Sequence, residues 1–131
     1  MILLADDSRF MRNWLKQILQ KHGYINFAEA SNGEQAVLMY RLVKPEIVFL
    51  DITMPKVDGF AALQQIMEIN PKAKVIMCSA LSTKANRTAA LRLGAMDFIV
   101  KPFFDDVDKI MEKVQETKGG RSFETCDFQT T

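Results

Sequence analysis

Five short apolar segments alternate with longer amphipathic stretches, and this alternation most limits how the chain can fold. The third and fourth segments contain continuous apolar runs, which are typical of parallel strands buried on both faces. Alternating strands and helices favour a parallel sheet with right-handed crossovers and helices on both sides. We therefore predict an α/β fold, with a doubly wound five-stranded parallel sheet in the order 2-1-3-4-5. The predicted strands are Ile2 to Ala5, Asn26 to Glu29, Ile47 to Leu50, Lys74 to Cys78 and Asp97 to Val100.

Helices are predicted between these strands from apolar periodicity and from capping residues. Asn32, with Gln35 three residues later, has the form of a capping box, and Asp58 can cap the next helix. The fourth helix has only a thin apolar face, formed by Ala85, Ala89 and Leu93, which suits an element that repacks. The predicted helices cover Ser8 to Lys21, Asn32 to Pro45, Asp58 to Asn70, Thr83 to Leu93 and Asp105 to Thr117.

The length of 131 residues fits one domain, which we predict at 1–118, followed by a polar tail or linker at 119–131. The net charge of +1 gives no reason to expect direct binding of nucleic acid or membrane. No apolar run approaches the roughly 20 residues of a membrane span, and the N-terminus lacks the basic region of a signal peptide. We therefore expect a cytoplasmic protein. Cys78 and Cys126 form no disulfide framework, and Cys78 is expected in the core.

Charged and polar residues follow four of the predicted strands, namely Asp6 and Asp7, Asp51, Ser79 and Lys101. In sheets of this kind, ligands bind beyond the carboxyl ends of the strands, where the winding reverses between strands 1 and 3. Each residue alone has an ordinary explanation, such as a helix cap or a surface charge. Together, on four separate strands, they predict a site for a divalent cation and a phosphoryl group.

The residue types of this site suit phosphoryl chemistry. The adjacent acids Asp6 and Asp7 repel each other, and their oxygens suit Mg²⁺, with Mn²⁺ as the alternative ion. Asp51 can act as a nucleophile, because aspartyl phosphates are known covalent intermediates. The Ser79 hydroxyl can hydrogen-bond a phosphoryl oxygen. The Lys101 ammonium can pair with carboxylates at rest and with phosphoryl oxygens after transfer.

The longer segments around these residues resemble the receiver domain of two-component response regulators, the CheY-like family. The resemblance implies a flavodoxin-like fold in which Asp51 accepts a phosphoryl group from a histidine kinase. It implies that the chain catalyses only its own phosphorylation and slow dephosphorylation, and that its output is binding to a target protein. The matching segments, which run in family order from residue 2 to about 117, are Leu3 to Ser8, Asp51 to Pro55 with Asp58-Gly59, Cys78 to Ala80, and Gly94 to Phe103.

The resemblance also implies a role for each residue of the site. Asp7 and Asp51 would bind Mg²⁺ directly, with the backbone carbonyl of Thr53 as the third protein ligand and Asp6 acting through a metal-bound water. Lys101 would contact the phosphate. Ser79 would turn toward it and vacate space for Phe98, which stands at the switch-aromatic position. This would change the face made by the helix at 83–93, the strand at 97–100 and the helix at 105–117.

The sequence departs from the commonest family pattern at the switch and near the site. Phe98 stands where many members have Tyr, so the ring has no hydroxyl to tether it. Thr53 and Leu81 occupy the two positions that tune dephosphorylation, and the apolar Leu81 suggests slow intrinsic turnover. We expect a monomer, with dimerisation on phosphorylation as an alternative.

Other functions are less consistent with these residues. A flavodoxin-like cofactor binder would need a phosphate-friendly loop where Asp6 and Asp7 stand. A Mg²⁺-dependent phosphatase would need a second Asp where Thr53 stands. Within the family, the wording of the motifs favours a stand-alone chemotaxis regulator whose target is the flagellar switch. The alternative is a receiver domain cut from a longer regulator such as a transcription factor.

Overall fold

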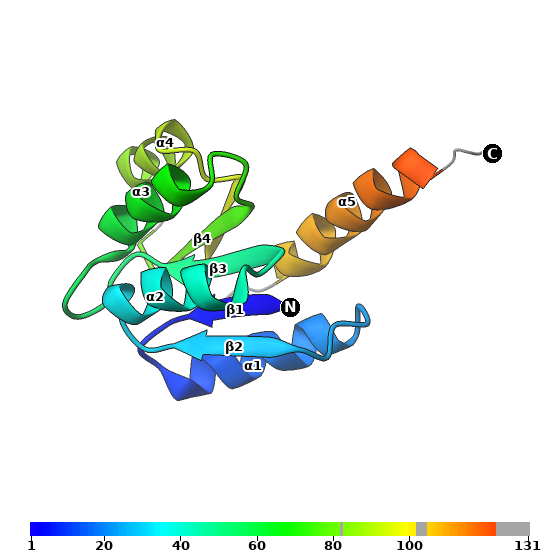
Figure 1. Cartoon of the computed structure of the whole chain (residues 1–131), viewed down its shortest axis with the longest axis horizontal. Coiled ribbons are helices and arrows are strands. Elements are labelled where there is room, and N and C mark those ends of the chain that lie inside the picture. The colour runs from blue at the N-terminus through cyan, green and yellow to red at the C-terminus, as the bar shows by residue number, and fades with distance from the viewer. Residues whose placement is uncertain (82, 102–104, 123–131) are drawn as a thin grey trace.

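The structure, a computed structural model, describes residues 1–81, 83–101 and 105–122. Strands and helices alternate along the whole described chain (Figure 1). The strands are β1 (Ile2–Ala5), β2 (Phe27–Ala30), β3 (Ile47–Asp51), β4 (Val75–Ser79) and β5 (Asp97–Val100). The helices are α1 (Arg9–Gln20), α2 (Gly33–Val43), α3 (Gly59–Ile69), α4 (Lys84–Arg92) and α5 (Asp105–Ser122).

The five strands form one parallel sheet in the order β2-β1-β3-β4-β5, which confirms the predicted topology. β1 pairs with β2 on one side and with β3 on the other, so the winding of the chain reverses between β1 and β3. The register pairs Ala5 with Leu50 and Asp51 with Cys78. The carboxyl ends of β1, β3 and β4 therefore lie level with one another at one edge of the sheet.

Each face of the sheet has its own apolar core. On one face, residues such as Leu3, Val48 and Met77 pack with α2, α3 and α4. On the other face, Leu4, Phe49 and Ile76 pack with α1 and α5. Because successive strand residues alternate between these two covered faces, every position of β1, β3 and β4 is buried. This double burial explains the continuous apolar runs in the sequence.

Side-chain caps fix where the helices begin. Asn32 Oδ1 accepts a hydrogen bond from the Gln35 backbone N–H at 2.8 Å, and Asp58 Oδ1 accepts one from Ala61 at 2.9 Å, as the capping signals predicted. The Gln35 side chain reaches back one residue further than in the usual capping box, because its Oε1 accepts from the Ser31 N–H at 2.9 Å. Ser8 and Thr83 cap α1 and α4 in the same way.

Several sequence expectations differ from the structure. β2 and β4 each lie one residue later than predicted, at Phe27–Ala30 and Val75–Ser79, and β3 ends one residue later, at Asp51. The buried residue of α4 is Ala90, whereas Ala85 is exposed, because helix orientation depends on the neighbouring elements as well as on apolar spacing. α5 continues to Ser122 through Gly119 and Gly120, past the predicted end at Thr117, and it projects beyond the sheet (Figure 1).

Some expectations fall on residues that the structure does not describe. These are the end of the last family segment, at Phe103, and the part of the predicted polar tail at 123–131. The domain boundary at 118 therefore stays a prediction. Cys78 is buried, as expected. Among the helices within the described ranges, none combines the length and apolar character of a membrane span.

Candidate functional site

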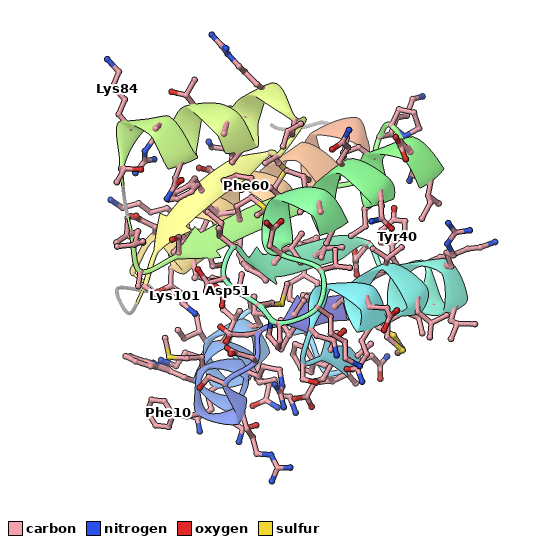
Figure 2. The ribbon with its side chains drawn as sticks, turned by 90° about the vertical axis from the view of Figure 1, so that its left-hand side faces the viewer. Phe10, Tyr40, Asp51, Phe60, Lys84 and Lys101 are labelled. Atoms are coloured by element: carbon pink, nitrogen blue, oxygen red, sulfur yellow. The ribbon has the colours of Figure 1, made fainter. Side chains whose placement is uncertain are left out.

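The polar residues singled out in the sequence gather at the carboxyl edge of the sheet. Asp51 and Ser79 are the last residues of β3 and β4, and Asp6 and Lys101 follow directly on β1 and β5. Figure 2 shows the labelled Asp51 and Lys101 close together at this edge. Strand ends that are level in the register therefore bring together residues up to 95 positions apart in the chain.

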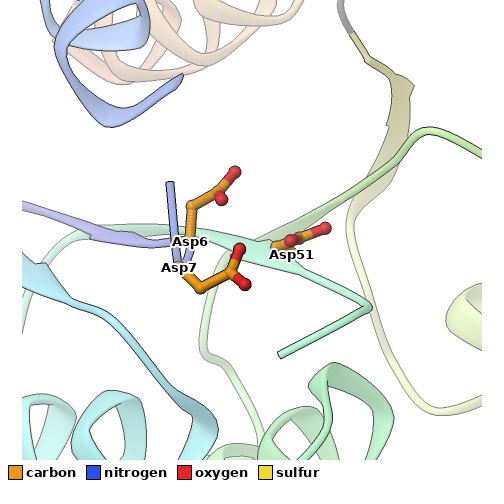
Figure 3. Close-up of side chains that lie close together, drawn as sticks. All are labelled: Asp6, Asp7 and Asp51. Carbon is orange, nitrogen blue, oxygen red and sulfur yellow. The ribbon is translucent and has the colours of Figure 1, made fainter. Parts of the chain in front are cut away.

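Asp6, Asp7 and Asp51 form an acidic cluster (Figure 3). Each offers one carboxylate oxygen, and these three oxygens lie within 4.8 Å of one another. Asp6 and Asp51 are buried, whereas Asp7 is exposed. The Asp6 carboxylate also accepts a hydrogen bond from the Ser8 backbone N–H at 2.9 Å, which fixes one of its oxygens. Three converging carboxylates at an open edge are suited to a hard divalent cation such as Mg²⁺.

Lys101 connects the acidic cluster to the far side of the site. Its Nζ donates a hydrogen bond to Asp6 Oδ2 at 2.8 Å and lies 3.3 Å from Asp51 Oδ2. Its backbone N–H donates to the Ser79 carbonyl at 2.8 Å, which continues the pairing of β4 and β5 by one step. Backbone pairing thus positions the residue, and the two buried carboxylates hold its ammonium group.

The surroundings of Asp51 raise the pKa of its carboxyl group. Burial, the largest cause, and the negative charge of Asp6 together raise the pKa of Asp51 to about 6, against the lowering effect of Lys101. Burial lowers the pKa of Lys101, but its hydrogen bond to Asp6 and the charge of Asp51 outweigh this and raise it overall. Three carboxylates and one ammonium leave an excess of negative charge, which a divalent cation at the cluster would neutralise.

Alternation along the strands places Ser79 on the other side of the sheet from Lys101. Met77 belongs to the core under α3 and α4, and Cys78 belongs to the opposite core, so Ser79 points to the α3–α4 side again. Ser79 is buried, and its Oγ accepts a hydrogen bond from the Leu81 backbone N–H at 3.0 Å. Phe98, on the same side of β5, is 3% exposed.

The loop after β3 holds the predicted third metal ligand and a close backbone contact that the sequence does not predict. The Thr53 backbone N–H donates a hydrogen bond to Asp51, and its side chain is exposed. Gly59 packs against the β3 end, where a Cβ would lie 2.6 Å from the Ile52 Cα. The Gly59 N–H donates to the Ile52 carbonyl at 2.7 Å. Glycine is required here because the first turn of α3 lies directly against the residues that carry Asp51.

Two further residues of the site region were missed in the sequence. Gly33, in the first turn of α2, lies so close to the same loop that a Cβ would be 2.6 Å from the Val57 carbonyl carbon. Arg12, on α1, donates to the Asp6 backbone carbonyl and to Glu29 Oε1, the latter at 2.8 Å. A glycine at a helix start is only a weak sequence signal, and nothing in the spacing of Arg12 indicates its partners.

This fold and this edge define the class of protein. The chain belongs to the response regulator receiver domain family, whose profile matches residues 2–115. It is similar to the chemotaxis protein CheY of Bacillus subtilis (strain 168), with 46% identity over 116 residues that cover 88% of this chain and 95% of that protein. It is 50% identical over 102 residues to CheY of Thermotoga maritima, covering 78% of this chain and 85% of that protein.

Solved structures give the same result. The crystal structure of a CheX-CheY-BeF3-Mg²⁺ complex from Borrelia burgdorferi is similar to this chain with a TM-score of 0.78 and 41% identity, covering 88% of this chain and 87% of that one. The relatives connect the chain with two-component signalling and with chemotaxis proteins of the CheY type. The cluster of Asp6, Asp7 and Asp51 fits the magnesium and phosphoacceptor site of such a domain. Membership of this family argues against the two other functions considered from the sequence, a flavodoxin-like cofactor binder and a Mg²⁺-dependent phosphatase.

Proposed function

We propose that the chain is a phosphoacceptor response regulator, in which Asp51 takes a phosphoryl group from the phosphohistidine of a histidine kinase. One observation carries this proposal: at the carboxyl edge of the sheet, the Asp51 carboxylate lies beside those of Asp6 and Asp7 and 3.3 Å from the Lys101 ammonium. A buried structural aspartate would need only the ammonium. The two additional carboxylates are explained by a cation that binds together with the phosphoryl group.

The residues present fit Mg²⁺, with Mn²⁺ as the alternative. Asp7, Asp51 and the Thr53 carbonyl would hold the ion, and Asp6 would act through a bound water. When bound, the ion shields the incoming phosphoryl group from the carboxylates. An Asp51 oxygen then forms a bond to phosphorus while the bond from phosphorus to the donor nitrogen breaks, and the electron pair leaves with that nitrogen. The Lys101 ammonium turns from the carboxylates to the phosphoryl oxygens.

The surroundings of Asp51 suit a long-lived intermediate. Asp51 is 4% exposed, so its carboxyl group has little contact with bulk water. Leu81, at one of the positions that tune dephosphorylation, offers no polar group to orient an attacking water, and it is 63% exposed. We therefore propose that the chain catalyses only its own phosphorylation and a slow hydrolysis, and that its biological output is binding.

For the output, we propose that Ser79 turns toward the phosphoryl group and that the α4-β5-α5 face, which includes Phe98, binds a target protein. A chemotaxis target such as the flagellar switch is supported by relatives named chemotaxis protein CheY, which the chain matches over up to 95% of their length. The alternative is a receiver from a larger regulator. It is supported by 43% identity to a protein-glutamate methylesterase/protein-glutamine glutaminase of Rhodospirillum rubrum, of which the chain covers 28%. Cytoplasmic location and a monomeric state stay predictions.

Phosphorylation with a small acyl phosphate tests the proposal without the kinase. With Mg²⁺, the wild-type chain should gain one phosphoryl group by intact mass, and Asp51→Asn should gain none. Asp58→Asn is the matched control, because Asp58 is an exposed aspartate of the adjacent loop and Asn caps a helix equally well. Equal labelling of Asp51→Asn and wild type would refute the proposal.

Two further variants test the neighbouring residues. Asp7→Ala should weaken Mg²⁺ binding markedly, and unchanged affinity by titration would exclude Asp7 as a ligand. Lys101→Arg should still be phosphorylated but should signal poorly, because a planar guanidinium presents its donors differently from an ammonium. Wild-type affinity of the phosphorylated variant for its partner would contradict this role.

A further inference from the structure

Arg87 of α4 lies over the ring of Phe98. Its guanidinium carbon is 5.1 Å from the ring centroid, within the range of a cation–π contact. Phe98 is only 3% exposed, although Arg87 itself is exposed. Ala90, one turn further along α4, is fully buried in the same apolar cluster as Phe98. The ring therefore lies under α4, with the small Ala90 in the cluster beside it and the guanidinium above it.

A chain of hydrogen bonds connects this helix to Ser79. Ser79 Oγ accepts from the Leu81 N–H at 3.0 Å, and the Leu81 carbonyl accepts from Asn86 Nδ2 at 3.3 Å. Asn86 is in turn fixed by the cap of α4, because its N–H donates to Thr83 Oγ1 at 3.1 Å. Arg87 is the next residue. The segment that holds the Ser79 hydroxyl and the helix that covers Phe98 are thus one connected unit.

Phe98 also lies on the same side of the sheet as Ser79. The register pairs Phe98 with Met77 and Val100 with Ser79, so the two residues are one alternation step apart on neighbouring strands. A Phe at this position has no hydroxyl through which the buried or the outward ring orientation could be held. Packing alone would leave the ring position to small differences in cavity shape. The guanidinium is the one group known from the described contacts to bind the ring face directly.

We propose that Arg87 is a positioning residue that holds the Phe98 ring in its buried position before any phosphoryl group is present. The effect of this contact on signalling rests on the proposed function, because phosphorylation would favour the buried position of the ring. A planar guanidinium suits this role, because it stacks on an aromatic face while its edges stay hydrated. The expected size is that of a partly exposed cation–π contact, which corresponds to a change of about two- to fivefold in the ratio of buried to outward ring.

The ring position is measured in the unphosphorylated protein. With 4-fluorophenylalanine at position 98 alone, ¹⁹F NMR with a soluble paramagnetic quencher reports how often the ring reaches solvent. Arg87→Leu, which keeps the bulk of the side chain, should lower the buried-to-outward ratio about two- to fivefold. Arg87→Lys should give a smaller loss. Arg92→Leu, which alters another exposed arginine of the same helix, should leave the ratio unchanged.

A double-mutant cycle links the ring to the site. Beryllofluoride with Mg²⁺ serves as the phosphoryl probe, and Arg87→Leu should weaken its binding in proportion to the fall in the buried fraction of the ring, and so by no more than the change in the ratio. In a Phe98→Leu background, Arg87→Leu should have no effect on this affinity. An unchanged ring position in Arg87→Leu, or an equal loss of affinity in both backgrounds, would overturn the inference. If the wild-type chain fails to bind the probe, the proposed function is wrong, while the ring measurement still decides the role of Arg87.

Discussion

Removing the charge of Asp51 should stabilise the metal-free protein. The ordinary pKa of an aspartate is 3.8, and burial together with the charge of Asp6 raises that of Asp51 to about 6, so the folded state holds the proton more tightly than the unfolded chain does. The ionised carboxylate therefore opposes folding at neutral pH, even beside Lys101. Asp51→Asn keeps the shape of the side chain and removes this charge. Its free energy of unfolding should exceed that of the wild type.

The size of the effect follows from the two pKa values. One pKa unit corresponds to about 1.4 kcal/mol, so a pKa raised from 3.8 to about 6 corresponds to an upper value of about 3 kcal/mol. The penalty is fully present above pH 6 and disappears as the pH falls from about 6 toward 3.8, because the folded state is protonated first. The variant has no such group. Its advantage should be about 2–3 kcal/mol at pH 7.5 and should approach zero near pH 4.

Urea denaturation in the presence of a chelator, repeated from pH 4 to pH 8, measures this difference. Asp58→Asn should follow the wild type at every pH, because Asp58 is exposed and Asn is an equivalent cap. Adding Mg²⁺ should raise the stability of the wild type more than that of Asp51→Asn. A variant that is less stable than the wild type at pH 7.5, or an advantage that does not change with pH, would show that the Asp51 charge is fully compensated by its partners.

Three other substitutions test neighbouring contacts. Gly59→Ala should destabilise the fold by about 1–3 kcal/mol in urea denaturation, because the new Cβ would overlap the end of β3; a change below 0.5 kcal/mol would contradict the close approach. Lys56→Gly should stabilise it by about 0.5–1 kcal/mol, because Lys56 has a φ of 67° in the left-handed region, and a lower melting temperature would contradict this. Lys101→Met should raise the Asp51 pKa above its present value of about 6, as measured by carboxyl ¹³C NMR, and an unchanged pKa would show that the ammonium is not the dominant compensating charge.

Much of the fold could be predicted from the sequence, because periodicity and capping act locally. The apolar runs of β3 and β4 indicate strands buried on both faces, and Asp58 marks the start of α3 through a hydrogen bond to a residue three positions away. The gathering of Asp6, Asp51 and Lys101 at one edge follows from parallel topology alone. These features need no knowledge of how the helices pack.

Other features depend on contacts between distant elements. The side of α4 that is buried depends on its packing against β5. Apolar spacing alone therefore predicted Ala85 on the buried face, where the structure has Ala90. The close approaches at Gly33 and Gly59 depend on where the loop after β3 passes, and the Arg87 contact with Phe98 depends on the distance between α4 and β5. The length of α5 was underestimated because a glycine pair usually ends a helix.

Mapping the phosphorylated residue tests the central claim most directly. After reaction with an acyl phosphate and Mg²⁺, borohydride reduction of the aspartyl phosphate marks the acceptor residue permanently, and peptide mass analysis locates it. The account predicts modification at Asp51 alone, dependent on Mg²⁺, with Asp6 and Asp7 unmodified. Modification at another residue, or none in a folded protein that binds Mg²⁺, would contradict it.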